Sequence, residues 1–262
     1  MARSRQRLDL ALVEAGLAES RSQAQALILA GKVKVGEETV RRSDRLVGTD
    51  LLQVATPPAY VSRAGAKLAG ALDAFGVRVA GRICADIGAS TGGFTDVLLQ
   101  RGASRVFAID VGRGLLHWRL RQDPRVVLME RVNARELEHL PERPDLVVMD
   151  LSFIGLELVL PAVCGCAPGA ELVVLFKPQF QVGRSEVGKG GVVRDEVAIA
   201  AALGRFRAWC ETRDIAVLDE VVSSLPGAEG NLERLLRLRA PQRWATEPET
   251  SPAIVQKARM TR

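Results

Sequence analysis

The chain has 262 residues, an apolar content of 47% and a formal net charge of +5 at pH 7. That length allows about two domains, and the apolar content can fill at least one substantial core, which excludes a disordered or collagen-like chain. The longest stretch without a charged residue covers positions 158–170 and contains two prolines, whereas a membrane helix needs roughly 20 apolar residues. No apolar signal region follows the basic N-terminal segment. We therefore expect a cytoplasmic protein without a membrane partner.

The cysteines and histidines do not form a metal-binding pattern. Cys164 and Cys166 are one residue too close for a Cys-x-x-Cys motif, and His117 and His139 are the only histidines in the sequence. We expect no metal. The basic balance suits a polyanion such as nucleic acid. Aromatic residues make up only 4% of the chain, so such a partner would be held mainly through its phosphates and shape.

The first 56 residues predict a small α+β domain. Apolar residues at helical spacing predict a helix over residues 8–15, and Ser20 with Gln23 forms a capping box that predicts the start of a second helix. Gly31 is expected to end that helix. Short strands are expected at 32–35, at 40 and at 51–54. Together these elements make a helix pair closed by a small sheet.

Basic side chains give this domain a candidate RNA-binding surface, because phosphates attract them. The alternative is an ordinary solvated face, since seven acidic residues accompany nine basic ones in residues 1–58. The basic residues in question are Arg3, Arg5, Arg7, Arg21, Lys32, Lys34, Arg41, Arg42 and Arg45.

A stiff Thr56-Pro57-Pro58 segment predicts the domain boundary, with a linker at 57–59. After it, strand-like runs alternate with helical stretches, which predicts a doubly wound α/β domain over 60–240 with a parallel sheet covered on both faces. The expected strands are 83–87, 106–109, 126–128, 146–149, 172–176 and 215–218. Residues 241–262 are expected to form a weakly patterned tail.

A glycine-rich turn follows the first of these strands, between Asp86 and Asp96, and leads into a helix. Ligands of open α/β sheets bind at this edge. A dinucleotide fingerprint is one interpretation, weakened because Ser90 stands where the middle glycine should be. A hydrolase nucleophile elbow is another, but no histidine follows His139 to complete a triad. A phosphate-binding P-loop is excluded because no lysine follows the glycines.

The third interpretation is a site for S-adenosylmethionine, which is cationic and carries no phosphate. Acidic residues at strand ends suit such a ligand. Asp110 ends the second strand and can accept hydrogen bonds from an adenosine ribose, although it could also simply cap a helix. The order of strand, turn, helix, strand and acid favours a methyltransferase over the other two interpretations.

Several motifs along the chain resemble those of one known family. The segments Arg7-Leu8-Asp9, Ser20-Arg-Ser-Gln-Ala24 and Gly31-Lys-Val33 resemble an S4-type RNA-binding domain. Nine further segments resemble motifs of the TlyA family. They are Tyr60-Val-Ser-Arg63, the Asp86 to Asp96 turn, Asp110-Val-Gly112, Asp123-Pro-Arg-Val126, Glu130-Arg-x-Asn133, Asp150-Leu-Ser-Phe-Ile154, Lys177-Pro-Gln-Phe-Gln-Val-Gly183, Gly188-Lys-Gly-Gly-Val-Val-Arg-Asp195 and Gly230-Asn-Leu-Glu233. The resemblance runs in order from the N-terminus to about residue 239. It implies an S4 domain, an FtsJ-like catalytic domain and 2′-O-methylation of cytidine in ribosomal RNA of one or both subunits.

The resemblance also implies a Lys-Asp-Lys-Glu catalytic tetrad, which matches Lys67, Asp150, Lys177 and Glu233. Asp150 and Lys177 follow apolar strands, which by itself places them at the ligand edge. Without the resemblance, Lys67 reads as a surface helix residue and Glu233 as a strand-face charge. Lys177 is expected to be the base, or the residue that positions the 2′-hydroxyl. Neither histidine is given a role.

The expected cofactor contacts come from the same motifs. They are Asp86, Gly88, Ser90, Thr91, Gly92, Gly93, Phe94, Thr95, Asp110, Val111, Asn133 and Asp150, and Arg63 joins the expected RNA contacts. The expected partner is ribosomal RNA or a ribosomal subunit, bound by a monomer. Two other functions stay open: a non-catalytic RNA-binding protein that retains the fold, and a membrane-lysing protein, since some family members carry a haemolysin name.

Overall fold

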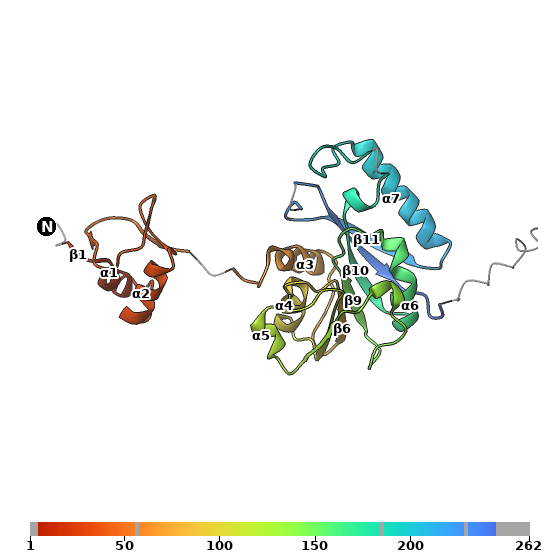
Figure 1. Cartoon of the computed structure of the whole chain (residues 1–262), viewed down its shortest axis with the longest axis horizontal. Helices are drawn as coiled ribbons and strands as arrows, with labels where there is room; N and C mark the ends of the chain where they lie inside the picture. Colours follow the sequence, from red (N-terminus) through yellow and green to blue (C-terminus); the bar gives the residue numbers. More distant parts are fainter. Residues whose placement is uncertain (1–4, 56–57, 184–185, 228–229, 245–262) are drawn as a thin grey trace, which may run out of the picture. The chain divides into compact units, whose positions relative to one another are not determined.

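The computed structural model describes residues 5–55, 58–183, 186–227 and 230–244. It contains two compact units, which divide between Pro58 and Ala59 and are shown in Figure 1. Arg3, position 56 at the end of the expected first domain, position 57 of the expected linker and most of the expected tail lie outside the described residues.

The first unit combines two helices with two small antiparallel sheets. In chain order its elements are β1 (Gln6–Arg7), α1 (Leu8–Glu14), α2 (Arg21–Leu29), β2 (Val33–Val35), β3 (Glu38–Val40), β4 (Leu46–Val47) and β5 (Leu52–Val54). One sheet has the strand order β3-β2-β5 and the other pairs β1 with β4. The predicted helix pair and three-stranded sheet are confirmed. The β1–β4 pair was not predicted, because two-residue strands leave no periodic pattern.

The first unit has a core of its own, which includes the fully buried Leu8, Leu12, Ile28 and Val33. The predicted cap of α2 is present, since Ser20 Oγ accepts a hydrogen bond from the Gln23 backbone N–H at 3.2 Å. The Gln23 side chain accepts from the N–H of Glu19, one residue before the position that a capping box requires.

The second unit is built on a seven-stranded sheet with helices on both faces. Its strands are β6 (Ile83–Ile87), β7 (Arg105–Asp110), β8 (Val126–Glu130), β9 (Leu146–Met149), β10 (Glu171–Phe176), β11 (Ala216–Val222) and β12 (Arg234–Arg239). Its helices are α3 (Arg63–Ala74), α4 (Gly93–Gln100), α5 (Trp118–Arg121), α6 (Leu160–Cys166) and α7 (Glu196–Glu211), with short 3₁₀ turns η1 (Ala134–Glu136), η2 (Leu156–Leu158) and η3 (Pro178–Phe180).

The strand order is β11-β12-β10-β9-β6-β7-β8. The pairs β10–β9, β9–β6, β6–β7 and β7–β8 are parallel, as predicted. The expectation of a wholly parallel sheet was wrong at one strand, because β12 runs antiparallel to both β10 and β11. The sequence analysis missed β12, whose arginines at 234, 237 and 239 interrupt its apolar pattern.

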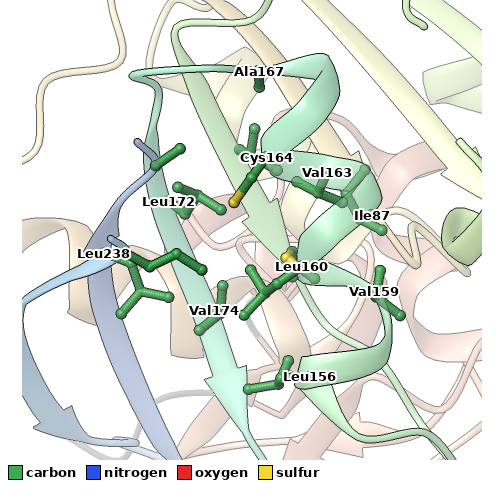
Figure 2. Close-up of a cluster of buried hydrophobic side chains, with 14 of the residues drawn as sticks. Ile87, Leu156, Val159, Leu160, Val163, Cys164, Ala167, Leu172, Val174 and Leu238 are labelled. Carbon is green, nitrogen blue, oxygen red and sulfur yellow. The ribbon is translucent and has the colours of Figure 1, made fainter. Parts of the chain in front are cut away.

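Two apolar clusters cover the two faces of this sheet. On one face, α3 and α4 pack against alternate strand residues such as Cys84 and Val106. On the other face, α6 and α7 pack against the intervening residues, and Figure 2 shows Leu160 and Cys164 of α6 beside Leu172 and Val174 of β10. The doubly wound fold class is therefore confirmed, and helices cover the central strands of the sheet on both faces. The carboxyl edge of these strands is where a ligand is expected.

Candidate active site

The carboxyl edge of the sheet collects the predicted catalytic residues. Asp150 follows β9, and Lys177 follows β10. The antiparallel β12 begins at this same edge, since its first residue, Arg234, is the register partner of Phe176 in β10. Glu233, directly before β12, therefore enters the edge next to Lys177. A strand that sequence analysis did not find is what brings Glu233 into the site.

The four predicted catalytic residues form two ion pairs. Lys177 Nζ lies 2.6 Å from Asp150 Oδ1 and donates a hydrogen bond to Ser152 Oγ at 3.0 Å. Lys67 Nζ lies 2.5 Å from Glu233 Oε2. Glu233 and Lys67 are buried, with exposed side-chain fractions of 2% and 10%. The readings of Lys67 as a surface residue and of Glu233 as a strand-face charge were therefore wrong.

Lys67 reaches the edge because α3 begins against the glycines of the turn. A Cβ at Gly93 would lie 2.2 Å from Ser62 Oγ and 3.0 Å from the Gly65 backbone N. Glycine at this position thus allows the first turn of α3 to approach α4. Lys67 lies one turn into α3 and points inward, whereas Arg63, four residues earlier on the same side of the helix, is exposed.

The turn after β6 is tight enough to require glycine. Gly88 has φ +84, and a Cβ there would lie 2.6 Å from the Asp150 backbone oxygen. Gly92 has φ +94, and Ser90 also adopts a left-handed conformation, with φ +47. Glycine adopts such angles without strain, whereas the left-handed conformation of Ser90 is strained, and strain of this kind often occurs at ligand sites.

Asp86 is a fully buried carboxyl group with only one of its oxygens satisfied. Its Oδ2 accepts hydrogen bonds from Thr95, from the backbone N–H at 2.8 Å and from the hydroxyl at 2.6 Å. Its Oδ1 has no partner among the described residues. Burial raises the pKa of Asp86 to about 7, and the negative charges of Asp150 and Asp110 add to this effect against the Thr95 hydrogen bonds. A hydrogen-bond donor or a cation next to Asp86 Oδ1 would offset the free-energy cost of burying the charged carboxylate.

Asp110 joins two loops at the end of β7. Its Oδ2 accepts from the Ser90 backbone N–H at 2.8 Å, and its Oδ1 accepts from the Gly112 N–H at 2.7 Å. Each carboxylate oxygen has a second lone pair, so it can accept one further hydrogen bond. Asp110 therefore has a structural role in addition to the ribose contact that was predicted for it.

The remaining predicted cofactor residues differ in their availability. Phe94 is buried and Val111 is 74% exposed. The Thr91 carbonyl accepts from the His117 backbone N–H. Asn133 caps η1 by accepting from the Arg135 N–H, and its side chain also donates to Glu136. It lies near Asp110 because the neighbouring Val132 N–H donates to the Asp110 carbonyl at 3.1 Å.

Several of the predicted RNA contacts have partners within the first unit. Arg7 and Arg21 donate to the buried carboxylate of Asp9 at 3.0 to 3.1 Å. The hydrogen bond from Arg7 is the largest of the influences that hold the pKa of Asp9 well below its usual range.

Other basic residues of this unit also have partners. Arg42 pairs with Asp44, Arg45 with Glu38, and Arg41 donates to the Leu29 carbonyl. In contrast, Arg5, Lys32 and Lys34 are exposed, and none of them forms an ion pair with another described residue.

Sequence analysis missed residues around Lys177. Ser152 contacts Lys177 directly, and its signal lay in the Asp150 to Ile154 motif. The next residue, Phe153, is 91% exposed with φ +66 and lies 5.2 Å, between ring centroids, from Phe180. A hollow of about 390 Å³ opens beside these rings. Gln179 also lines it, and its buried Oε1 atom has no hydrogen-bond partner among the described residues.

Among the described residues, no group of three or more His, Cys, Asp or Glu side chains is placed to hold a metal ion. Within the same residues, no helix is both long and apolar enough to cross a membrane.

Comparison with known proteins agrees with this geometry. The profile of the FtsJ-like methyltransferase family matches residues 60–239, and that of the S4 domain matches residues 6–52. The chain is 51% identical over 241 residues to the 16S/23S rRNA (cytidine-2'-O)-methyltransferase TlyA of Mycobacterium tuberculosis, with 90% of each chain covered. It is 40% identical to Hemolysin A of Brachyspira hyodysenteriae, over 87% of this chain and 98% of that one.

A solved protein from Streptococcus thermophilus that bears a hemolysin name superposes with a TM-score of 0.70 at 37% identity, covering 95% of this chain and 94% of that chain. The relatives thus match over both units. The chain therefore belongs to the TlyA family, in which an S4 domain precedes an FtsJ-like methyltransferase domain.

Proposed function

We propose that this chain transfers a methyl group from S-adenosylmethionine to the 2′-hydroxyl of a cytidine in ribosomal RNA. The observation that carries the proposal is the arrangement of Lys177 with Asp150 beside Lys67 with Glu233 at the carboxyl edge. The M. tuberculosis relative, which is named for this reaction, supports the choice of substrate. We propose cytoplasmic action on ribosomal subunits for the same reason.

The carboxyl edge fits a cationic cofactor without phosphate. Asp86, Asp110 and Asp150 provide acidic groups there, and the unpartnered Asp86 Oδ1 needs a donor or a positive charge. Asp110 can accept from the ribose hydroxyls, and the turn from Gly88 to Gly93 lets the backbone approach closely. When bound, S-adenosylmethionine supplies an electrophilic methyl group on a sulfonium.

The tetrad supplies what the acceptor needs. A ribose hydroxyl is a weak nucleophile at neutral pH, so it must be oriented and must lose its proton as the methyl group transfers. Lys177 is proposed to position this hydroxyl and, in its neutral form, to accept the proton at Nζ. Asp150 and Ser152 hold the Lys177 amine in place. Glu233 holds Lys67, whose positive charge can stabilise the oxygen as it becomes negative.

Removing the Lys177 amine tests this assignment. Lys177→Ala should bind S-adenosylmethionine and RNA nearly as the wild type does, yet transfer methyl at least about 10²-fold more slowly, the usual scale for a positioned acid–base group. The measurement is single-turnover transfer of labelled methyl to ribosomal subunits. Arg105→Ala is the control, because Arg105 begins β7 at the opposite edge of the sheet. Near-wild-type turnover by Lys177→Ala would reject Lys177 as the base or positioning group.

The substrate assignment has its own test. Ribosomal RNA from cells with and without the gene should differ in 2′-O-methylation at one or more cytidines. Identical maps, together with no transfer by the purified protein, would favour the alternative of a non-catalytic RNA-binding protein.

A further inference from the structure

A glycine-containing loop, residues 188–195, is joined directly to the catalytic edge by Asn231. This side chain is 1% exposed. Its Oδ1 accepts from the Val193 backbone N–H at 2.9 Å, and its Nδ2 donates to the Gly191 carbonyl at 2.9 Å. Asn231 lies two residues before Glu233, which limits their separation to about 7 Å along the chain. The loop and the Lys67–Glu233 pair are therefore held by the same short segment.

The backbone of this loop needs its glycines. Gly190 and Gly191 are consecutive residues with φ +78 and +76, a combination that side chains disfavour. The Gly188 N–H donates to the Val192 carbonyl at 3.0 Å and closes the turn. A Cβ at Gly188 would lie 2.8 Å from that carbonyl oxygen. The Gly188–Val192 hydrogen bond and the two hydrogen bonds of the buried Asn231 thus hold the base of the loop.

The loop exposes two cations that have no hydrogen-bond or ion-pair partner among the described residues: Lys189 and Arg194. Each of the two acidic neighbours uses one carboxylate oxygen to accept hydrogen bonds from backbone N–H groups, and neither pairs with Lys189 or Arg194. Glu186 accepts from the Gly183 N–H, and Asp195 accepts from the N–H groups at the start of α7. Both cations line a hollow of about 440 Å³, whose other lining residues are Glu186, Gly188, Val192 and Asp195.

We propose that the loop 188–195 is a phosphate-binding site for the substrate RNA strand next to the target nucleotide, with Lys189 and Arg194 as the contacts and Asn231 as the residue that positions them. The inference rests on the proposed function. Cations without a partner need not give up an existing ion pair when a phosphate binds, and a loop held by Asn231 loses little backbone freedom. Their attachment through Asn231 places the held phosphate close to the Lys67–Glu233 pair.

The first test measures RNA binding without the methyl donor, so it does not depend on catalysis. Lys189→Gln with Arg194→Gln should weaken binding to ribosomal RNA roughly tenfold at about 0.1 M salt and reduce the slope of log K against log salt by about 1 to 2. The affinity for S-adenosylmethionine should not change. Arg207→Gln is the matched control, because Arg207 is an exposed arginine of α7 that already pairs with Glu220.

If the double variant binds RNA with the same affinity and the same salt slope as the wild-type protein, the inference is wrong. If the wild-type protein binds RNA but transfers no methyl, the proposed function fails, and the same binding data still decide whether the loop holds phosphate.

The second test concerns Asn231 and uses coupling between variants. If Asn231 positions the cations, then in an Asn231→Ala protein the Lys189→Gln and Arg194→Gln changes should cost much less RNA affinity than they do in the wild type. A purely structural loss from Asn231→Ala would leave their cost unchanged, and such additivity would overturn the positioning role.

Discussion

Lys67 and Glu233 form an ion pair that is almost entirely removed from water. Removing either partner leaves the other charge buried and uncompensated, which typically costs about 3 to 5 kcal/mol. We expect Lys67→Met and Glu233→Gln each to lower the free energy of unfolding by that amount, and the double variant to lose far less than the sum. Urea denaturation of the four proteins measures this. Additive losses would mean that the pair is not energetically coupled.

The raised pKa of Asp86 predicts that cofactor binding depends on pH. Its pKa of about 7 in the folded protein exceeds the value of about 3.9 expected in the unfolded chain. The folded protein therefore keeps a proton that the unfolded chain loses, so the stability due to Asp86 is full below about pH 4 and is lost as pH rises through 7. A cationic ligand favours the charged carboxylate, so binding should release this proton.

We accordingly expect the affinity for S-adenosylmethionine to rise several-fold between pH 6 and pH 8, with proton release detectable by calorimetry in buffers of different ionisation enthalpy. S-adenosylhomocysteine, which lacks the sulfonium charge, should show a weaker dependence. Asp86→Asn should bind less tightly and with a flat profile. A flat profile in the wild-type protein would show that Asp86 does not meet the cation.

Sequence analysis could place Asp150 and Lys177 but not their partners. Both follow apolar strands, and local patterns locate strand ends well. The burial of Lys67 depends on the contact of α3 with Gly93, and that of Glu233 depends on the direction of β12. These are long-range packing contacts, and the local spacing of apolar residues carries no information about them. Only the family resemblance therefore indicated these two residues.

At the level of elements, β12 shows why part of the sheet was missed. Its arginines break the apolar pattern, yet they are paired across the sheet. Arg237 pairs with Glu171 of β10, and Arg234 pairs with Glu220 of β11. Both acids are distant in sequence from the arginines that they pair with. The arginines of β12 therefore fit into the sheet only when β10 and β11 lie on either side of β12.

The segment before β12 makes a close contact that can be tested. A Cβ at Gly227 would lie 2.5 Å from Glu233 Oε1. Gly227→Ala should displace this carboxylate and lower methyl transfer at least about tenfold, because small misplacements in an active site cost activity steeply. Gly204→Ala in α7 is the control, since a Cβ there meets nothing within 4 Å. It should keep full activity and gain up to about 1 kcal/mol of stability. Equal activities would mean that the Glu233 carboxylate can shift without consequence.

In the first unit, Asp9 connects α1 to the start of α2. Its buried carboxylate accepts from Arg7, Arg21 and Gln25. Since its pKa is depressed, this stabilisation is present above about pH 4 and is lost as pH falls further. Asp9→Ala should lower the unfolding temperature of this unit by several degrees, because Arg7, Arg21 and Gln25 lose their common acceptor. Asp44→Ala, which removes an exposed pair, should change little. Thermal unfolding followed by circular dichroism compares them.

At the scale of the whole molecule, the two units have separate apolar cores. All four tetrad residues and every expected cofactor contact lie in the second unit. The cations Arg5, Lys32 and Lys34, which form no ion pair with another described residue, lie in the first unit, whereas Arg63, Lys189 and Arg194 lie in the second. This division suggests that RNA affinity draws on both units and that cofactor binding draws on one.

A chain that lacks residues 1–57 should therefore fold, bind S-adenosylmethionine with wild-type affinity and lose most of its methylation of ribosomal subunits. The physical reason is that phosphate contacts from the first unit would no longer hold the substrate. In the full chain, Lys32→Gln with Lys34→Gln should reproduce part of the loss and reduce the salt slope of RNA binding by about 1 to 2. Calorimetry and single-turnover methylation separate the two effects. Methylation of subunits by the truncated chain at the wild-type rate would assign the first unit some other task.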